Sequence, residues 1–485
     1  MSKVAPALLW FRRDLRLADN PALMAALRQD GGVIPVFILD ETSPGLRPLG
    51  GAARWWLGRS LDVLRQSLEK YGVQLILRRG ATLPILRQLA KETGARALHF
   101  NRRFDPPGFA LDQKVTDALR TDGVEVEDHD ANYLHEPWQL TTKQGEPFKV
   151  FTPFWRRLSD QYNPPALHLA PKQWPVHKPN PKSEPIKSFR FAPFWATGFD
   201  EAWQPGEAGA REQLTDFLDD TIDDYSTDRD RPDLRGTSRL SPHLAWGEIS
   251  VHRAWRQAET GSVGAAAFRR ELAWRDFNMH VYHHFPDLPT IPWQTGFRNF
   301  PFKKNSLGLP AWQQGQTGYP LVDAGMRELW QTGWMHNRVR MVVASFLIKH
   351  QLIDWRRGEE WFWDTLVDAD PAQNAGNWQW VAGCGFDAAP FFRIFNPTLQ
   401  AQKFDPKGDY IRQWVPELVA LDNKGLREPW KLSAATLHEA EVSLGKDYPK
   451  PIVDHDDARK RALSVYRQVS GKKTTLGPRK SARSK

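Results

Sequence analysis

The sequence predicts an N-terminal α/β domain built on a doubly wound parallel sheet, followed by an all-α C-terminal domain. Short apolar runs alternate with helix-like segments through about residue 130, as expected of strands and helices in such a sheet. Strand signals are scarce beyond residue 206, and 485 residues exceed the length of one ordinary domain. We therefore expect an α/β domain at 1–130, a long interdomain connector at 131–205, an α-helical domain at 206–468 and a basic, disordered tail at 469–485.

The first domain is predicted from its apolar runs. The expected strands are Ala7–Phe11, Val33–Leu39, Val73–Leu77, Ala97–Phe100 and Val124–Val126. The expected helices are Pro21–Arg28, Ala52–Tyr71, Leu83–Thr93 and Leu111–Thr121. Ligands of such sheets bind at the carboxyl ends of the strands. No G-x-G-x-x-G follows the first strand. F-R-R-D-L-R-L-A-D-N-P at Phe11–Pro21 stands there instead, and its simplest alternative is a charged surface loop.

The remaining organisation follows from proline, periodicity and charge. Prolines cluster between residues 164 and 185, which predicts a connector that runs over the surface. Amphipathic segments separated by Gly and Pro fill the third region and predict helices. The tail from Gly471 to Lys485 carries six Lys or Arg and no acidic residue, and we expect it to be disordered.

The composition excludes several classes of protein and favours a polyanionic partner. A single cysteine, Cys384, excludes intramolecular disulfides, iron–sulfur clusters and cysteine zinc sites, and no apolar run reaches membrane-spanning length. The net charge of +9 favours binding to a polyanion. The 22 tryptophans exceed ordinary usage roughly three- to fourfold, which suggests stacking on bases or on a flat cofactor. The N-terminus enters a strand without a signal peptide, which favours a cytoplasmic enzyme.

Hydroxyl groups cluster in R-G-T-S-R-L-S-P at Arg235–Pro242. Thr237, Ser238 and Ser241, with a glycine before them and an arginine among them, suit a bound phosphate. N-capping of the following helix explains the same residues without a ligand.

One face of a predicted helix carries an unusual set of side chains. In E-L-A-W-R-D-F-N, the residues at i, i+3, i+4 and i+7 are Glu271, Trp274, Arg275 and Asn278. An acid, an indole, a guanidinium and an amide pack poorly in a core but form a good wall for a polar, planar ligand. The histidines that follow lack a matching carboxylate pattern, so a solvated or packed role is favoured over metal binding and no metal site is predicted. They are His280, His283 and His284.

Arg340 lies in an apolar helix predicted from W-M-H-N-R-V-R-M, where a guanidinium requires a carboxylate partner. Asp368 and Asp370 are the candidates. They begin D-A-D-P-A-Q-N-A-G-N-W-Q-W at Asp368–Trp380, which combines two carboxylates, an asparagine and two indoles. This stretch either lines a pocket or starts a helix with acidic caps and core tryptophans.

Together these segments resemble the DNA photolyase/cryptochrome family over nearly the whole chain. W-F-R-R-D-L-R is similar to the family's N-terminal signature. G-T-S-R-L-S-P, L-A-W-R-D-F, T-G-Y-P-L-V-D-A-G-M-R, W-M-H-N-R-V-R-M, N-W-Q-W and F-R-I-F-N-P follow in the family's order and spacing. Within the family the chain most resembles class I-type cyclobutane pyrimidine dimer (deoxyribodipyrimidine) photolyases. The resemblance implies an antenna domain and a helical domain that buries a U-shaped FAD.

The resemblance also implies which residues hold the FAD. Arg340, paired with Asp368, is expected beside the isoalloxazine, Asp370 toward the ribose or adenine, and Asn374 at flavin N5. The expected cofactor-binding residues are Tyr225, Thr237, Ser238, Arg239, Leu240, Ser241, Arg275, Arg340, Asp368, Asp370 and Asn374.

The implied reaction is light-dependent repair of cyclobutane pyrimidine dimers in DNA. Excited reduced FAD donates an electron to a dimer flipped out of the helix, and the reaction is that of a carbon–carbon lyase, deoxyribodipyrimidine photolyase. We also expect the protein to be a cytoplasmic monomer without a membrane partner. The expected catalytic residues are Glu271, Trp274, Asn337, Met341, Asn374 and Trp380. DNA contacts, mostly with phosphates, are expected from Arg229, Glu271, Trp274, Asn337, Arg338 and Gln400.

Two alternatives within the family are weighed at the same positions. The (6-4) photolyases resemble W-I-H-H-L-A-R-H where this chain has Asn337 and Met341, so (6-4) repair is disfavoured. Plant-type cryptochromes carry Asp at the N5 position and Tyr at the second indole, where this chain has Asn374 and Trp380. A cryptochrome-like blue-light photoreceptor is the second candidate. A signalling function beside repair and the role of the basic tail stay open.

The family's electron-transfer tryptophans are matched in part. Trp378 and Trp355 correspond to the first two, whereas the third position is Phe302, which is too hard to oxidise. Candidates for the terminal donor are Trp312, Trp330 and Trp363.

An antenna site is expected in the first domain. N-R-R-F-D at Asn101–Asp105 resembles the loop that holds a folate antenna through an Asn and a carboxylate, here Asn101 and Asp105. A methenyltetrahydrofolate-type folate, a deazaflavin or no antenna remain open.

Overall fold

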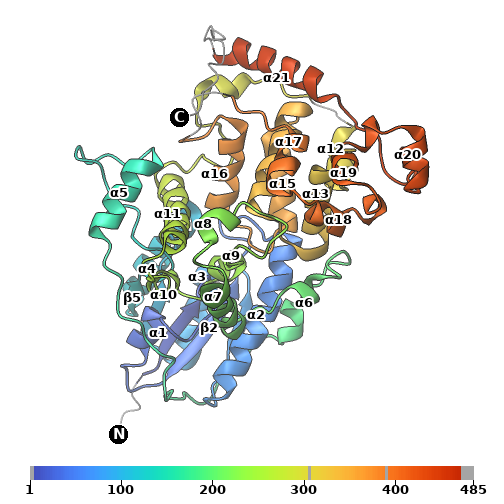
Figure 1. Cartoon of the computed structure of the whole chain (residues 1–485). Helices are drawn as coiled ribbons and strands as arrows, with labels where there is room; N and C mark the ends of the chain where they lie inside the picture. Colours follow the sequence, from blue (N-terminus) through green and yellow to red (C-terminus); the bar gives the residue numbers. More distant parts are fainter. Residues whose placement is uncertain (1–4, 304–306, 388–391, 471–485) are drawn as a thin grey trace.

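A computed structural model describes residues 5–303, 307–387 and 392–470. Figure 1 shows a sheet flanked by helices in the lower part of the molecule and a larger helical region above it. The predicted fold class, an α/β domain followed by an all-α domain, is confirmed. No described helix combines the length and apolar character needed to cross a membrane.

Within the described residues the strands form one five-stranded parallel sheet, in the order β3-β2-β1-β4-β5. The strands are β1 (Ala7–Phe11), β2 (Val33–Leu39), β3 (Ile76–Arg79), β4 (Ala97–Asn101) and β5 (Glu125–His129). β1 and β2 match the prediction residue for residue, whereas β3 and β5 begin later and end later than their apolar runs. Both lie at the edges of the sheet, where polar residues are tolerated and the apolar run does not mark the strand end.

Helices cover both faces of the sheet. They are α1 (Pro21–Ala26), α2 (Gly51–Glu69), α3 (Thr82–Thr93) and α4 (Pro106–Thr121). Leu9 and Phe11 of β1 pack with α1 and α2, whereas Leu8 and Trp10 point to the α3 and α4 face. Asn20 and Asp105 cap α1 and α4, and each is followed by a proline, which fits the first helical turn.

The connector is more structured than predicted. It contains α5 (Phe151–Gln161), the 3₁₀ turn η1 (Ile186–Phe189) and α6 (Phe199–Ala202). The sequence did not predict α5, because the prolines of this region favour an irregular connector. Phe151, Phe154 and Leu158 nevertheless lie on one helical face and are buried in the core of the helical domain. The connector therefore contributes to two hydrophobic cores as well as crossing the surface.

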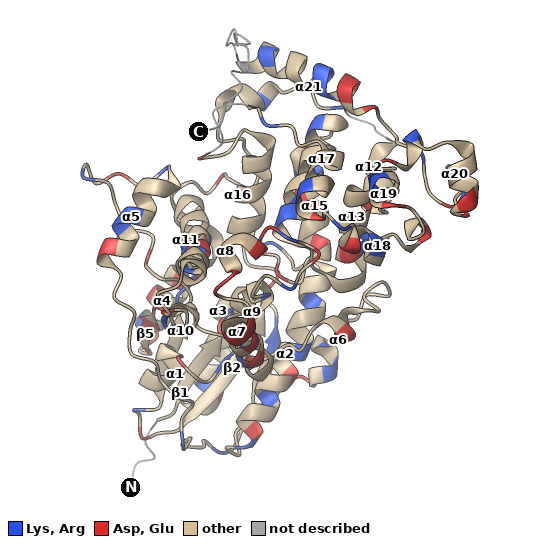
Figure 2. Ribbon diagram, in the orientation of Figure 1, with Lys and Arg blue, Asp and Glu red and all other residues tan. Residues whose placement is uncertain are grey.

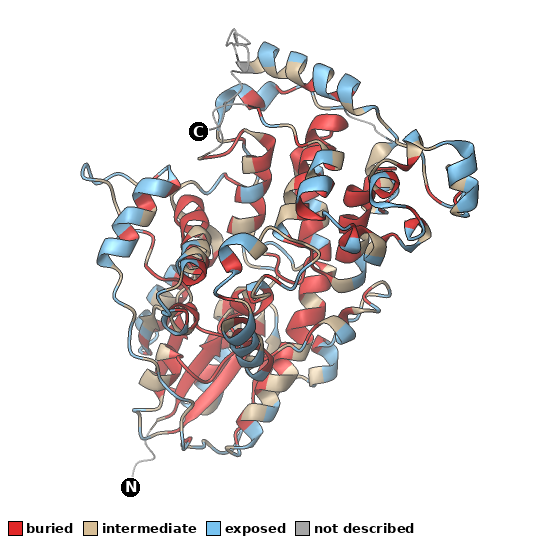
Figure 3. Cartoon of the chain, in the orientation of Figure 1, coloured by how far each residue is buried: buried red, intermediate tan, exposed pale blue. Residues whose placement is uncertain are grey.

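In the described part of the third region every regular element is helical. Figure 3 shows the buried helices at its centre. Its N-terminal half contains α7 (Glu207–Asp220), α8 (Tyr225–Asp228), α9 (Ser241–Trp246), α10 (Val251–Gln257), α11 (Val263–His284), η2 (Thr295–Asn299) and α12 (Gly308–Gln313). Its C-terminal half contains α13 (Pro320–Thr332), α14 (Asn337–Ser345), η3 (Phe346–His350), α15 (Trp355–Thr365), α16 (Pro371–Ala382), α17 (Pro397–Phe404), α18 (Asp409–Trp414), η4 (Pro416–Leu418), α19 (Asn423–Arg427), η5 (Pro429–Lys431), α20 (Ala434–Glu439) and α21 (His455–Ser470).

The predicted start of the tail at residue 469 falls inside α21. The expected disorder concerns residues 471–485, which lie outside the described part of the chain.

The segment Phe11–Pro21 joins the two domains and is not a surface loop. The side chains of Asp14 and Arg16 are buried, and Arg16 donates hydrogen bonds to the carbonyl oxygens of Gly247, Ala131 and Asp19. A side chain at Gly247 would meet the Arg13 carbonyl oxygen at 1.9 Å, and φ there is +65°. Glycine is therefore required where the helical domain approaches the first strand's carboxyl end.

Candidate functional site

A cavity of about 570 Å³ lies in the helical domain between α8, α9, α11, α14, α15 and α16. We call it the helical cavity. Its size is typical of a binding site for an organic ligand. The sequence-predicted residues that line it are Tyr225, Arg229, Ser238, Ser241, Glu271, Trp274, Arg275, Asn337, Arg340, Met341, Asp368, Asp370, Asn374, Trp378 and Trp380.

The segment Asp368–Trp380 fits both of its alternative interpretations. Asp370 is the N-cap of α16, and its Oδ1 accepts hydrogen bonds at 2.9 Å from the backbone nitrogens of Ala372 and Gln373. Pro371 occupies the first turn, as the local sequence requires. The same helix places Asn374, Trp378 and Trp380 in the cavity wall. The helix that Asp370 caps is therefore also a wall of the cavity, and the two interpretations hold together.

Asp368 is the carboxylate partner of Arg340, as predicted. The guanidinium nitrogens lie 3.2 Å and 2.8 Å from the two carboxylate oxygens, a bidentate arrangement. The Ser241 hydroxyl also donates to Asp368 Oδ2 at 2.6 Å. Arg340 Nε donates to the Met335 carbonyl oxygen at 2.7 Å, so the pair is fixed from both sides.

Asn374 is oriented by a residue that the sequence did not reveal. Its amide nitrogen donates to the backbone oxygen of Glu359 at 3.0 Å and to Glu359 Oε1 at 2.8 Å. Two acceptors around one nitrogen leave the amide carbonyl oxygen for the cavity. Glu359 in turn is paired with Arg47 through contacts of 2.7 Å and 3.0 Å. Arg47 belongs to the first domain, 312 residues away in the sequence, which is why the relay was not predicted.

The hydroxyl segment contributes only some of its predicted residues to the cavity wall. Ser238 and Ser241 line the cavity, whereas Thr237, Arg239 and Leu240 do not. Arg239 has a φ of +50° and its guanidinium lies over the rings of Trp203 and Trp334, at 4.5 Å and 4.9 Å. Direct side-chain contact of Arg239 with a ligand in the cavity is therefore not supported.

The predicted face of α11 forms one wall of the cavity. Glu271 is paired with Arg229, and Trp274 stacks on Phe151 with ring centroids 3.7 Å apart and an interplanar angle of 9°. Arg275 lines the cavity, but its guanidinium donates to the carbonyl oxygens of Asn132 and Leu244. Two of its guanidinium nitrogens are therefore already hydrogen-bonded to the backbone.

The opposite wall comes from α14 and α16. Asn337 is exposed at the rim, Met341 is half-buried, and the Trp380 indole nitrogen donates to the Asp387 carbonyl oxygen at 3.1 Å. The N-cap of α14 is His336, and burial lowers its pKa to about 4, so this imidazole is neutral at neutral pH. The residues that distinguish the family's subtypes thus lie together on one side of the cavity.

A basic groove of about 590 Å³ lies on the surface at α14, α17 and α21. Arg338 and Gln400, two of the predicted DNA-contacting residues, line it. Figure 2 marks the Lys and Arg positions of α17 and α21 in blue. The ionisable side chains of the groove are Arg338, Arg393, Lys403, His455, Asp456 and Arg459, a predominantly cationic set.

Comparison with known proteins agrees with this geometry. Residues 268–468 match the family described as FAD binding domain of DNA photolyase, and residues 7–175 match DNA photolyase. The chain is 50% identical over 481 residues to deoxyribodipyrimidine photo-lyase of Agrobacterium fabrum, a match that covers 98% of this chain and 99% of the relative. The chain belongs to the DNA photolyase/cryptochrome family.

Other relatives span both branches of the family. Cryptochrome-1 of Arabidopsis thaliana is 38% identical over 96% of this chain and 70% of its own length. A solved structure of a bacterial class III photolyase from Agrobacterium tumefaciens superposes with a TM-score of 0.94 at 50% identity, covering 97% of this chain and 99% of that one. Its description as class III differs from the class I-type resemblance seen in the motifs, so the subclass stays a prediction.

The side chains of the helical cavity fit the flavin dinucleotide that the family's FAD-binding domain implies. The two serine hydroxyls and the Arg340–Asp368 pair supply donors and acceptors for a polar, charged ligand. The apolar lining residues include Phe362, Leu366 and Trp378. A cavity that combines these polar groups with apolar side chains suits a molecule with phosphates and a fused ring system.

Of the predicted electron-transfer residues, Trp378 lines the helical cavity. Trp378 packs on α15 so closely that a Cβ on Gly358 would lie 2.1 Å from its ring. Trp355, one turn earlier on α15, is fully buried. Phe302 is half-buried beside Phe300 and cannot replace an oxidisable indole.

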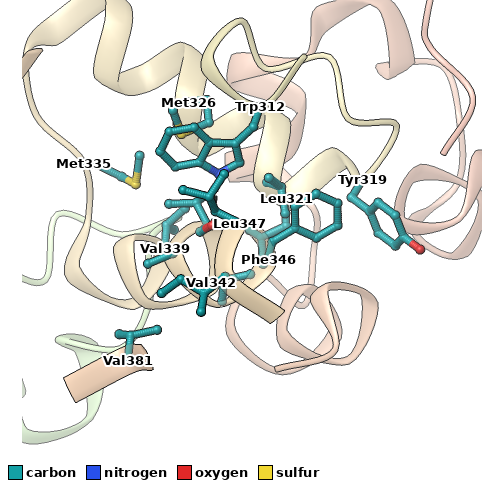
Figure 4. Packing of buried hydrophobic residues seen from close by; sticks show 14 of the residues in the cluster. Trp312, Tyr319, Leu321, Met326, Met335, Val339, Val342, Phe346, Leu347 and Val381 are labelled. Carbon is teal, nitrogen blue, oxygen red and sulfur yellow. Dashed lines mark hydrogen bonds between the residues drawn. The ribbon is translucent and has the colours of Figure 1, made fainter. Parts of the chain in front are cut away.

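The candidates for a terminal donor differ in exposure. The Trp312 and Trp378 rings are in contact, with centroids 6.2 Å apart, but Trp312 is completely buried. Figure 4 shows it among apolar side chains that include Met326 and Leu347. Trp363 is also buried, whereas Trp330 is 38% exposed. Trp312 is placed to exchange an electron with Trp378, but its burial argues against a role as the surface donor.

A second cavity, of about 320 Å³, lies between the carboxyl ends of the strands and the helical domain. We call it the interdomain cavity. Asp105 lines it and is held by a bidentate pair with Arg103. Asn101 does not line it: its buried amide donates to Asp14 and Asn20 inside the first domain. Of the two predicted antenna residues, only Asp105 lines this cavity.

Charged and aromatic side chains line the interdomain cavity, with one more cation than anion. They are Arg12, Arg13, Arg47 and Arg103, the carboxylates of Asp40, Glu41 and Asp105, and the indoles of Trp10, Trp246 and Trp363. Burial and the neighbouring Arg103 lower the pKa of the Arg13 guanidinium to about 10. An anionic, aromatic ligand would relieve this crowding of positive charge.

The histidines of α11 have packing roles. His280 Nε2 accepts a hydrogen bond from the Phe148 backbone nitrogen at 3.0 Å. His283 and His284 bond to the carbonyl oxygens of Phe104 and Pro137. These contacts account for one ring nitrogen of each histidine, and among the described residues His280 Nδ1 is buried without a hydrogen-bond partner.

Proposed function

We propose that this protein repairs cyclobutane pyrimidine dimers in DNA, using light absorbed by a reduced FAD held in the helical cavity. The observation that carries the proposal is the composition of that one cavity. It combines the Arg340–Asp368 pair and Asn374, which suit a flavin, with Glu271, Trp274 and Trp380, which suit a splayed-out pyrimidine pair. Named photolyases among the relatives support the same activity.

Each wall residue has a chemical task in this proposal. Trp274 and Trp380 clamp the flipped dimer between apolar surfaces. Glu271 binds the polar edge of a pyrimidine once Arg229 turns to the DNA backbone, while Asn337 and Met341 close the rim. When bound, the reduced flavin supplies the light-driven electron for ring opening. The residues supply orientation, water exclusion and electrostatic stabilisation.

The deciding experiment is a repair assay on defined substrates. Flavin-loaded protein is incubated with oligonucleotides that contain either a cyclobutane dimer or a (6-4) lesion, in blue light and in darkness. We expect restoration of the cyclobutane dimer only under light. No loss of dimers in light with reduced flavin bound would contradict the proposal.

The second candidate, a blue-light photoreceptor, is favoured by the cryptochromes among the relatives. It predicts a light-dependent change in protease sensitivity or partner binding without dimer repair. Repair of the (6-4) lesion is disfavoured because Asn337 and Met341 occupy the cavity wall in place of histidines.

We further propose that the interdomain cavity binds an antenna chromophore. The four guanidinium groups favour an anionic chromophore and the indoles favour a flat one, as in a folate or a deazaflavin. Extraction of pigment from the purified protein, followed by mass spectrometry, distinguishes the two and tests whether either is present.

The Arg47–Glu359–Asn374 relay gives a testable effect on the flavin. In Glu359→Leu the amide nitrogen of Asn374 loses its side-chain acceptor and the carbonyl oxygen is no longer held toward N5. Reduced flavin carries a hydrogen on N5, so losing an acceptor there disfavours reduction. We expect the two-electron midpoint potential of the flavin to fall by about 10–30 mV, the equivalent of one hydrogen bond.

Spectroelectrochemical titration measures this shift. Glu360→Leu is the matched control, since Glu360 is exposed and paired with Arg357 on the outer face of the same helix. Arg47→Met should shift the potential in the same direction as Glu359→Leu. Equal midpoint potentials in Glu359→Leu and the wild type would contradict the assignment of Asn374 to flavin N5.

The basic groove predicts a salt effect on DNA binding. Arg338→Gln and Lys403→Gln each remove one phosphate contact, so each variant should lower the slope of log K against log salt by about one. The loss should be equal for damaged and undamaged DNA, because phosphates carry no damage information. Lys460→Gln, an exposed charge on α21 outside the groove, should leave the slope unchanged.

A further inference from the structure

A cluster of potential metal ligands lies at the edge of the sheet, outside the helical cavity, the interdomain cavity and the basic groove. β4 and β5 pair in parallel with His99 opposite Glu127, and His129 follows Glu127 by two residues. Because side chains alternate along a strand, all three project from the same face of the sheet. His99 is only 1% exposed, whereas Glu127 is 47% exposed, so the group is open to solvent on one side.

The three side chains converge on a small volume. His99 Nδ1 lies 3.5 Å from Glu127 Oε2, and His129 Nε2 lies 3.9 Å from the same oxygen. One donor atom from each residue lies within 4.8 Å of the other two. In a tetrahedral zinc site with bonds of about 2.0–2.1 Å, neighbouring donors are about 3.4 Å apart. The observed separations are therefore close to that spacing, and the half-exposed Glu127 is free to adjust.

The two imidazole nitrogens that face the group have no hydrogen bond. Within the described residues, His99 Nδ1 and His129 Nε2 are buried atoms without a hydrogen-bond partner. Buried polar atoms are nearly always satisfied, so two such atoms directed at one carboxylate require an explanation. A bound cation would satisfy both nitrogens and the carboxylate together.

The far side of His99 is supported as in a metal site. Its Nε2 lies 3.0 Å from the side-chain nitrogen Nε2 of Gln29, which follows α1. A 180° rotation of this amide exchanges its nitrogen and oxygen, so that the oxygen accepts the Nε2 hydrogen of His99 and Nδ1 carries the free lone pair. Metal-binding histidines are usually held in this way by an acceptor on their second nitrogen. The rings of His99 and His129 are stacked, 6.0 Å apart at 19°, which limits their rotation.

We propose that His99, Glu127 and His129 bind one divalent transition-metal ion, with Zn²⁺ as the preferred occupant. Two imidazoles and a carboxylate suit zinc, whereas magnesium and calcium prefer oxygen ligands alone. Three protein ligands leave a fourth position for water at the exposed side of Glu127. The ion fastens the edge strand β5 to β4 at the point where the chain leaves the sheet for the connector.

The test uses full-length, flavin-loaded protein freed of metal by chelator and titrated with Zn²⁺. Isothermal titration calorimetry should give one high-affinity zinc per chain, and the melting temperature should rise with zinc because the ion binds the folded state. Glu127→Gln and His129→Asn, both at partly exposed positions, should weaken binding at least tenfold. Gln29→Leu should weaken it roughly 10- to 100-fold through loss of the supporting acceptor.

Glu125→Gln is the matched control, since Glu125 is an exposed carboxylate two residues earlier on the same strand and face. It should bind zinc like the wild type. Failure of the wild type to bind zinc would overturn the proposal. So would equal binding by the wild type, Glu127→Gln and His129→Asn, because the zinc would then be held adventitiously by other histidines.

Discussion

Asp368→Asn is expected to abolish flavin binding and to destabilise the fold. The substitution leaves the Arg340 guanidinium without its carboxylate partner, and it weakens the acceptor of the Ser241 hydroxyl. Breaking a buried ion pair from one side costs about 3–5 kcal/mol. The Arg340 side chain is 24% exposed, so we expect the lower end, about 3 kcal/mol in the free energy of unfolding. Chemical denaturation and the flavin-to-protein absorbance ratio measure the two effects.

A double variant separates stability from cofactor binding. Arg340→Leu combined with Asp368→Leu removes both charges, so no unpaired ion remains and most of the lost stability should return. Flavin binding should not return, because the double variant lacks the guanidinium and the carboxylate that are proposed to contact the flavin. Asp457→Asn on the exposed surface of α21 serves as the control and should change neither quantity. Retention of flavin by Asp368→Asn would contradict the assigned role.

Trp274→Ala is expected to weaken binding of dimer-containing DNA about 5- to 150-fold. Stacking of a base on an aromatic side chain contributes about 1–3 kcal/mol, and the Trp274 indole is one of the two that line the proposed dimer pocket. Affinity for undamaged duplex should be nearly unchanged, because an unflipped strand does not reach the cavity. Competition binding with matched damaged and undamaged oligonucleotides measures the difference.

The stack of Trp274 on Phe151 requires a structural control. Trp274→Phe preserves an aromatic ring in that stack and should retain most of the discrimination. Trp330→Ala removes an exposed indole elsewhere in the helical domain and should have no effect on DNA binding. Equal losses for damaged and undamaged DNA in Trp274→Ala would indicate a general folding defect instead of a lost dimer contact.

Local patterns predicted the parts of the site that local physics decides. Arg340 required a carboxylate because it sits in an apolar helix, and Asp368 fulfils that requirement. Asp370 was recognisable as a cap because a proline follows it at the start of α16. The face formed by Glu271 and Trp274 was predicted from helical spacing alone, and it does line the cavity.

Features decided by tertiary packing were not predictable in the same way. Asn101 has the residue type expected of an antenna contact, but its amide is used inside the first domain. Arg239 lies within the hydroxyl motif, yet a positive φ turns it toward two indoles. The pairing of Glu359 with Arg47 joins residues that share no motif and lie in different domains. His99 and Glu127 are likewise brought together only by the register of two strands.

Arg47 connects the interdomain cavity to the helical cavity through Glu359 and Asn374. It lines the interdomain cavity, where its guanidinium lies 4.2 Å from the centre of the Trp363 ring, and its charge holds the carboxylate that orients Asn374. An anionic chromophore that contacts Arg47, as proposed, would thereby change the free energy of flavin reduction. Thermodynamic reciprocity then requires that the oxidation state of the flavin changes the affinity of the chromophore by the same factor. The retention of the pigment and the midpoint potential of the flavin would thus both measure the same coupling free energy, which the Arg47 guanidinium transmits.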